Sequence, residues 1–117
     1  MLVEYGHVVD NHAWDRADQV FSQNIGFDRG DSGQPDLHGI AEIVATFRGR
    51  NAYAHHTTNV VVTQDEDGTV RVHSKLLCLP NEGPVITGDY YDVMTRTPAG
   101  WRIAHRRAEL RQRKFYD

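Results

Sequence analysis

The apolar residues of this chain follow a helical period in its first half and a two-residue period in its second half. Segments 2–10 and 39–48 carry apolar side chains at steps of three and four, which is the spacing of one helix face. A third helical stripe runs over 13–21, and Asn11 before it is a residue type that caps helices. The pattern therefore predicts three helices, all in the N-terminal half.

The second half predicts a meander of antiparallel strands. The acidic turn Asp65-Glu66-Asp67-Gly68 and the turn Pro98-Ala99-Gly100 separate segments that are rich in β-branched or alternating residues. We expect the main strands at 53–63, 69–79, 85–97 and 101–113, a short strand near 24–28 and a surface loop over 28–36. Helices followed by a meander indicate an α+β fold with helices on one face of the sheet. A curved sheet covered in this way leaves a pocket between the layers, where small ligands bind.

Composition excludes several classes of protein. The chain has 117 residues, of which 39% are hydrophobic and 25% charged, as expected for one folded domain over 1–117 rather than a disordered chain. No apolar run approaches the roughly 20 residues of a membrane span, and no export leader is recognisable, so we expect a cytoplasmic protein without membrane contact. The single Cys78 excludes an internal disulfide and a cysteine-cluster metal site, and it suits a reducing compartment.

Charge is divided unevenly along the chain. Residues 1–100 hold seven basic and fourteen acidic groups, net −7, whereas residues 101–117 hold six basic and two acidic groups, net +4. Because the domain as a whole is acidic, we expect no nucleic-acid partner. We interpret the basic tail as the solvent face of the last strand, with Arg107 as its best candidate to reach a pocket because alternation places it with Trp101, Ile103 and His105.

Several short motifs follow one another in a characteristic order. They are Tyr5 with Asp10 and Asn11-His12-Ala13-Trp14-Asp15, a helix from Gly39 that leads to His55-His56-Thr57-Thr58-Asn59, and Gly88, Tyr90, Asp92 and Arg96 before Gly100-Trp101-Arg102-Ile103. In this order the chain resembles the SnoaL-like branch of the nuclear transport factor two-like superfamily. The resemblance implies a cone, in which three N-terminal helices pack on a strongly curved, mainly antiparallel sheet that is open at one end.

The resemblance also implies a range of activities, because one scaffold carries many chemistries. The superfamily includes scytalone dehydratase, ketosteroid isomerase, polyketide cyclases, limonene epoxide hydrolase and dioxygenase small subunits. We therefore expect a cofactor-free lyase, isomerase or cyclase that uses general acid/base catalysis on a small hydrophobic substrate with a carbonyl group. Two alternatives stay open: a non-catalytic ligand-binding or assembly subunit, and a hydrolase like the epoxide hydrolases.

Asp10 and His56 are the predicted catalytic pair. Asp10 matches the helix carboxylate of scytalone dehydratase, and His56 matches the histidine on its first strand. Period-two alternation places His56 on one face with Val60 and Val62. An imidazole suits proton transfer at neutral pH, and a carboxylate fixes its tautomer. We predict that Asp10 and His56 face one cavity within hydrogen-bond reach, directly or through one water.

Other residues supply candidate substrate contacts. The predicted substrate-binding residues are Tyr5, Trp14, Tyr53, Tyr91 and Arg107. An alternative hypothesis pairs Tyr5, as an oxyanion donor, with Asp28, as a carboxylate base, as in ketosteroid isomerases. Adjacent histidines on a strand point to opposite faces, so we expect no metal site at His55 and His56. Cys78 is predicted to be a small buried hydrophobe rather than a nucleophile.

The outer face of the sheet is predicted to form a homodimer. Leu77 and Leu79 alternate away from Leu76 and Cys78, so both faces of that strand carry apolar residues. The family implied by the resemblance commonly dimerises through this face. Asp92 and Arg96, four residues apart on one strand, are predicted to pair at the surface.

Overall fold

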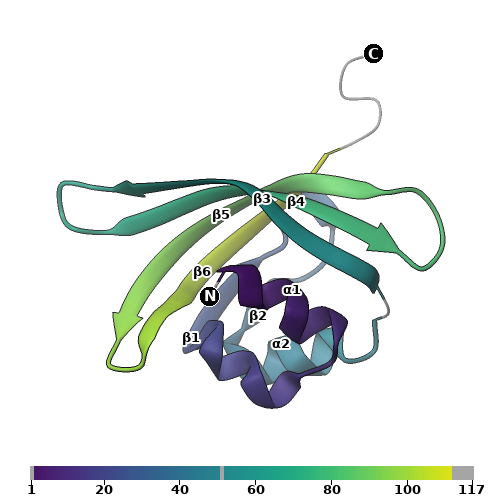
Figure 1. Ribbon diagram of the computed structural model, residues 1–117, viewed down its shortest axis with the longest axis horizontal. Helices are drawn as coiled ribbons and strands as arrows, with labels where there is room; N and C mark the ends of the chain where they lie inside the picture. Colours follow the sequence, from purple (N-terminus) through teal and green to yellow (C-terminus); the bar gives the residue numbers. More distant parts are fainter. Residues whose placement is uncertain (1, 51, 112–117) are drawn as a thin grey trace.

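Figure 1 shows a computed structural model of the chain, which describes residues 2–50 and 52–111. Helices and a single curved sheet form two layers, with α1 and α2 on the same concave side of the sheet (Figure 1). The elements in chain order are α1 (Leu2–Asp10), the 3-10 helix η1 (Trp14–Gln19), β1 (Phe21–Asp28), the 3-10 turn η2 (Gly30–Ser32), β2 (Leu37–His38), α2 (Gly39–Phe47), β3 (Ala52–Gln64), β4 (Val70–Pro80), β5 (Ile86–Thr97) and β6 (Gly100–Leu110).

The sheet has six strands in the order β2-β1-β6-β5-β4-β3. β1 runs parallel to β6, and the other neighbouring strands pair antiparallel. The predicted α+β class with a curved, mainly antiparallel sheet is confirmed. The predicted helices over 2–10 and 39–48 and the four long strands are also found, the last of them ending at Leu110; positions 112 and 113 lie outside the described residues.

The helix predicted over 13–21 is the element that differs. It is a 3-10 helix that stops at Gln19, and Phe21 already begins β1. Tertiary pairing overrides the local helical period here, because the backbone N–H of Ile103 donates to the carbonyl of Val20 at 2.9 Å. The strand buries Phe21, Ile25 and Phe27 against the helices. Its apolar residues therefore pack into the core from a strand, not from the predicted helix. The short strand predicted near 24–28 is therefore real and longer than expected.

The core lies between the concave face of the sheet and the helices. Its fully buried members include Val8 of α1, Ile43 of α2, and Ile25 and Ile103 of the central strands. Burial of this many branched side chains fixes the two layers against each other, at roughly 1.5–3 kcal/mol for each side chain removed from water. None of the helices in the described residues is long and apolar enough to cross a membrane.

Two bulges decide which side chains face the core. In β3 the register with β4 shifts between Thr58 and Val61, where Asn59 has a positive φ of 54°. In β6 the register with β5 shifts beside Ala104, because Met94 pairs with Ile103 whereas Val93 pairs with His105. Each extra residue reverses the inward and outward alternation of the rest of its strand.

Candidate functional site

Asp10 and His55 form a pair at the point where α1 meets β3. Nδ1 of the His55 ring lies 2.6 Å from Oδ1 of Asp10, and the backbone N–H of His55 donates to Oδ2 at 2.7 Å. Both side chains are only 17% exposed. A single carboxylate therefore holds the strand backbone and the imidazole together, and the ring is fixed in one orientation.

His56 is not the partner of Asp10, and the predicted pairing is wrong by one residue. His56 is exposed and pairs in register with Leu77, whereas His55 pairs with the buried Cys78 on the inner face. The physical reason is the bulge at Asn59. Counting back by twos from Val62 reaches His56, but the extra residue in the bulge brings His55 to the inner face instead.

Gly6 allows α1 to come this close to β3. A Cβ atom at position 6 would lie 2.7 Å from the backbone oxygen of His55, which is closer than packed atoms approach. Gly6 lies one helical turn before Asp10, so the same close approach carries the carboxylate to the imidazole. Glycine lowers the intrinsic stability of a helix, but the close contact between α1 and β3 requires a residue without a Cβ atom at position 6.

Two adjoining cavities open beside His55 on the concave side. Their volumes are about 220 and 380 Å³, and they share Arg50, His55, Cys78 and Ile86. The smaller one also contacts Tyr5 and Val9, and the larger one contacts residues from β1, β4, β5 and β6. The walls are predominantly apolar, and the exposed polar side chains on the larger cavity are those of Ser32, Gln34 and Arg50. This is the concave pocket that the sequence predicts between the two layers.

A charged pair stabilises the inner layer behind Tyr5. Arg106 donates to both carboxylate oxygens of Asp92 at 2.8 Å, and both side chains are 0% exposed. Its guanidinium lies 4.6 Å from the ring centre of Tyr5 and 3.7 Å from that of Tyr90. Burial by itself would lower the pKa of Arg106, but the hydrogen bonds and charge of Asp92 raise it above its ordinary value. Arg106 is therefore a permanent buried cation.

This buried pair does not follow from the sequence pattern. Asp92 binds Arg106 inside the core, so its predicted surface pair with Arg96 is wrong. Arg107 does not share a face with Ile103 either, because the bulge at Ala104 sends Arg106 inward and Arg107 outward. The one signal for this pair in the sequence is that Asp92 and Arg106 lie on two strands that the predicted meander makes neighbours.

Burial raises the pKa values of two tyrosines and the cysteine near the cavities, so these three groups keep their protons. Burial raises the pKa of Tyr5 above its usual range, although the charge of Arg106 and a hydrogen bond with Tyr90 oppose the effect. Burial raises the pKa of Tyr90 further. Burial, followed by the charge of Asp10, also raises the pKa of the Cys78 thiol. Cys78 is 7% exposed, as its apolar pattern predicts, and its environment disfavours a reactive thiolate.

The predicted substrate contacts are divided between two sides of the molecule. Tyr5 lines the smaller cavity, whereas Trp14 packs beside the core and His12 and lines neither cavity. Tyr53 is 76% exposed. Tyr91 and Arg107 lie on the outer face of the sheet, where they line a different hollow.

Asp28 also lies away from Tyr5. Its Oδ1 accepts from the backbone N–H of Gly30 at 2.8 Å, and its Oδ2 lies 3.9 Å from Nε of Arg107 on the outer side. Tyr5 is buried in the inner layer. The structure therefore does not bring together the tyrosine and carboxylate of the isomerase-type hypothesis.

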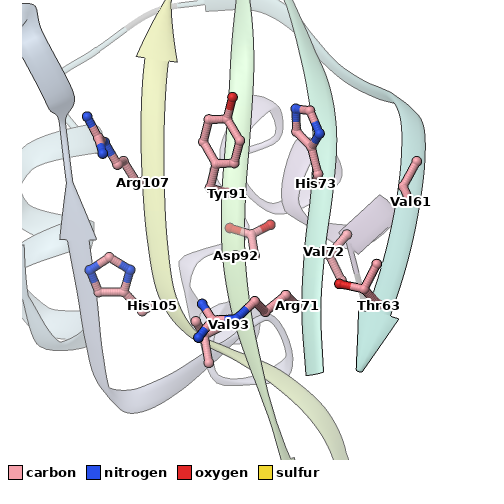
Figure 2. Close-up of a pocket in the computed structure, with 10 residues that line it drawn as sticks. All are labelled: Val61, Thr63, Arg71, Val72, His73, Tyr91, Asp92, Val93, His105 and Arg107. Carbon is pink, nitrogen blue, oxygen red and sulfur yellow. The ribbon is translucent and has the colours of Figure 1, made fainter. Parts of the chain in front are cut away.

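The outer hollow has a volume of about 460 Å³ and lies across β6, β5, β4 and the edge strand β3 (Figure 2). Arg107, Tyr91, His73 and Val61 stand in a row across β6, β5, β4 and β3, as their register requires (Figure 2). The rings of His73 and Tyr91 are stacked, with centres 4.6 Å apart and planes inclined by 13°.

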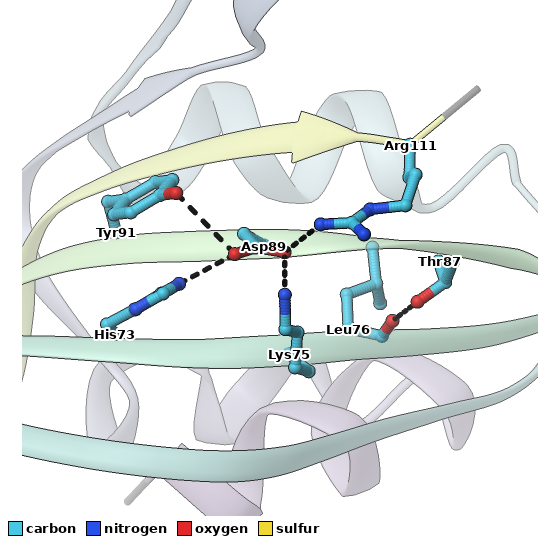
Figure 3. Close-up of polar contacts among 7 residues, drawn as sticks. All are labelled: His73, Lys75, Leu76, Thr87, Asp89, Tyr91 and Arg111. Atoms are coloured by element: carbon cyan, nitrogen blue, oxygen red, sulfur yellow. Dashed lines mark hydrogen bonds and ion pairs between the residues drawn. The ribbon is translucent and has the colours of Figure 1, made fainter. Parts of the chain in front are cut away.

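Asp89 is the centre of a polar network on this outer face (Figure 3). Its carboxylate lies 2.6 Å from Nε2 of His73, 2.7 Å from Nζ of Lys75 and 3.9 Å from Nη2 of Arg111. Burial opposes ionisation, but the hydrogen bonds from Lys75 and His73 outweigh it and hold the pKa of Asp89 below its usual range. Sequence reasoning did not single out this network, because its members become neighbours only through strand register.

The described part of the chain contains no cluster of metal-ligating side chains. Among residues 2–50 and 52–111, no group of three or more His, Cys, Asp or Glu side chains is placed to hold one ion. The groups at the inner site that can move or hold a proton are the imidazole of His55, the carboxylate of Asp10 and the phenol of Tyr5.

Comparison with known proteins identifies the family. The sequence model of the SnoaL-like domain matches residues 1–107, and the chain belongs to this family, as its motifs predict. None of the curated proteins compared by sequence matches the chain.

Solved structures share the fold. A candidate aromatic ring hydroxylase from Novosphingobium aromaticivorans is 25% identical, with a TM-score of 0.77 over 95% of this chain and 84% of that chain. A candidate scytalone dehydratase from the same organism is 16% identical, with a TM-score of 0.71 over 95% of this chain and 79% of that one. ActVI-ORFA from Streptomyces coelicolor is 19% identical, with a TM-score of 0.64 over 89% and 87% of the two chains. At these last two identities the likeness shows the fold alone.

Proposed function

We propose that the protein is a cofactor-free general acid/base catalyst of the lyase, isomerase or cyclase type. Its substrate is a small hydrophobic molecule with a carbonyl group, bound in the concave cavities. The observation that carries the proposal is the 2.6 Å contact between Nδ1 of His55 and Asp10. It leaves Nε2 of His55 without a hydrogen-bond partner among the described residues, in a side chain that lines both cavities.

The proposed mechanism starts from the tautomer that Asp10 favours. The carboxylate accepts a hydrogen bond from the N–H at Nδ1, so the lone pair of Nε2 is free to remove a proton from the carbon next to the carbonyl. Asp10 then stabilises the imidazolium that forms. The proton returns to another atom of the substrate in an isomerisation, or it accompanies a leaving group in an elimination.

Tyr5 is the proposed donor to the developing oxyanion. It lines the same cavity as His55, and their rings meet edge to face with centres 6.0 Å apart. Because its pKa is raised by burial, Tyr5 keeps its proton and is available as a hydrogen-bond donor. The buried cation of Arg106, 4.6 Å from the Tyr5 ring, favours negative charge nearby. These steps transfer only protons, which supports a reaction without a cofactor.

Family membership supports this class of reaction. The chain belongs to the SnoaL-like family, and one structural neighbour is named as a candidate scytalone dehydratase. A hydrolase that activates water at a buried Asp–Arg pair is less favoured, because Asp92 and Arg106 are both 0% exposed.

Proton abstraction from 5-nitrobenzisoxazole tests the proposal. This small aromatic compound releases a coloured phenolate when a positioned base removes its carbon-bound proton. We expect turnover by the wild-type protein, and a loss of about 100- to 10,000-fold in kcat/KM for His55→Ala. His56→Ala is the matched control, because His56 is adjacent and exposed, and it should keep the wild-type rate.

Equal rates in the wild type and His55→Ala would contradict the general-base role. The protein would then be better described as a non-catalytic ligand-binding or assembly subunit. Native mass spectrometry of the purified protein distinguishes that case, because a retained small molecule would identify the bound ligand directly.

We further propose that the protein is a homodimer formed through the outer face of the sheet. We also propose that it resides in a reducing compartment such as the cytoplasm. Leu77 and Tyr91 on this face are 37% and 42% exposed, which is substantial apolar area for a sheet surface. The free thiol of Cys78 supports a reducing environment. Sedimentation should give a species of twice 13.3 kDa for the wild type, and Leu77→Lys should shift it to the monomer. A wild-type monomer at micromolar concentration would contradict the proposal.

A further inference from the structure

Arg29 is an unusual arginine because it is buried at the larger inner cavity. It follows directly after β1, and only 9% of it is exposed. Its Nε donates to the carbonyl of Pro35 at 2.9 Å, which anchors the side chain. Its Nη1 is buried and has no hydrogen-bond partner among the described residues. A buried, unpartnered guanidinium N–H is costly unless a ligand accepts from it.

Arg50 brings a second positive charge to the same cavity. It follows α2, is exposed, and lines both inner cavities together with His55. Its guanidinium lies 5.7 Å from the ring centre of Phe47, which guides the side chain along the cavity wall. Burial, followed by the charge of Arg50, lowers the pKa of Arg29, while the charge of Asp36 opposes that effect. The two arginines therefore repel each other, and an anion between them would relieve the repulsion.

We infer that Arg29 and Arg50 form a carboxylate-binding subsite, so that the substrate is an apolar acid rather than a neutral compound. The carboxylate accepts from Nη1 of Arg29 and from the Arg50 guanidinium. The apolar body then extends along Leu76, Cys78 and Tyr90, which line the same cavity, toward His55. The inference rests on the proposed function, because it assigns the substrate class of the cavity that holds His55.

A carboxylate fits this subsite better than a phosphate. The guanidinium fork matches the plane of a carboxylate, and one buried N–H with one exposed arginine offers few donors for a dianion. The carbonyl of Pro35 occupies Nε of Arg29, and the carboxylate of Asp36 accepts from the Arg29 backbone N–H at 3.4 Å. These acceptors would repel the additional oxygens and charge of a phosphate.

Paired ligands that differ only in charge test the subsite. The probes are 2-naphthoate and its neutral isostere 2-naphthamide, titrated into the full chain and followed by NMR shifts of the residues that line the cavity. We expect naphthoate to bind about 10- to 100-fold more tightly, as for a charge-assisted hydrogen bond. Arg50→Gln and Arg29→Gln should each bring the ratio of the two dissociation constants close to one. Arg50 is exposed, so its variant should keep the fold even if Arg29→Gln does not.

Two further variants separate this inference from the catalytic one. Arg48→Gln removes an exposed positive charge two residues before Arg50 that lines neither inner cavity, and it should keep the wild-type preference for naphthoate. His55→Ala should also keep that preference, even though it abolishes proton abstraction. The inference is overturned if naphthamide binds as tightly as naphthoate, if Arg50→Gln keeps the wild-type ratio, or if naphthoate shifts no cavity residue at its solubility limit.

Discussion

An aspartate–histidine pair lies on each face of the sheet, and the two pairs share a contact distance but differ in their surroundings. On the inner face Asp10 meets Nδ1 of His55 at 2.6 Å, and on the outer face Asp89 meets Nε2 of His73 at the same distance. Asp89 also binds Lys75 at 2.7 Å, and Tyr91 stacks on His73. The outer pair is therefore part of a satisfied network, in which the carboxylate is neutralised by a cation.

Asp10 has no lysine or arginine within ion-pair distance among the described residues, and its histidine lines an apolar cavity. Hydrogen-bond geometry alone would rate the two pairs as equal candidates for catalysis. Their surroundings separate them, because His73 is 47% exposed and its carboxylate partner also binds Lys75, whereas His55 is 17% exposed and lines the inner cavities. The comparison shows that a candidate dyad must be judged by its burial and by the other partners of its carboxylate.

The largest expected difference in stability between the two faces concerns the ion pairs of two adjacent arginines, the inward Arg106 and the outward Arg107. Asp92→Asn leaves the fully buried Arg106 uncompensated, and we expect it to lower the free energy of unfolding by about 3–5 kcal/mol. Arg107→Gln removes an outer ion pair with Glu109 whose arginine is 47% exposed, and we expect a change of about 0–1 kcal/mol. Urea denaturation of the two variants beside the wild type measures both effects.

A double variant sharpens this test. Asp92→Leu combined with Arg106→Met removes both charges and should recover much of the stability that Asp92→Asn loses, because well-packed apolar residues can replace a buried ion pair. Comparable losses for Asp92→Asn and Arg107→Gln would mean that the inner pair is hydrated in solution, and the contrast between the faces would fail.

Substitution of Gly6, at the contact between α1 and β3, should have the next largest effect on stability. Gly6→Ala places a methyl group 2.7 Å from the His55 backbone oxygen, so α1 must move away from β3. We expect a loss of about 1–3 kcal/mol from overpacking, together with weaker proton abstraction by His55. Gly49→Ala is the control, since nothing lies within 4 Å of a Cβ there. Thermal denaturation and the 5-nitrobenzisoxazole assay give the two readouts, and a fully active, stable Gly6→Ala protein would contradict the close approach.

The outer Asp89–His73 pair should contribute to the pH dependence of stability rather than to activity. The folded protein holds the pKa of Asp89 below its ordinary value of about 4. Its stabilisation is therefore complete above that ordinary pKa and is lost as the pH falls through the lower folded value. Asp89→Asn should cost about 1–3 kcal/mol at pH 7 and progressively less below about pH 4. Denaturation at fixed protein concentration across this range checks it, and a cost independent of pH would exclude the charged network as its origin.

Much of the fold follows from local pattern. The helix over 39–48 and the strand over 69–79 are predicted within a residue or two, because each buries one face and its periodicity records that face. The buried Cys78 and the exposed Leu77 follow from the same alternation. Over 13–21 the pattern misleads, because Phe21 meets the core from a strand that pairs with β6, about 80 residues later in the chain.

Sequence alone determined the family and the layers, and it predicted Asp10 as a carboxylate that pairs with a strand histidine. Tertiary structure decided which of two adjacent residues joins that carboxylate: His55 rather than His56 faces inward, and likewise Arg106 rather than Arg107. The reason is the same on both strands. Alternation fixes which residues share a face only as far as the next bulge, and the bulges at Asn59 and Ala104 arise from pairing with neighbouring strands.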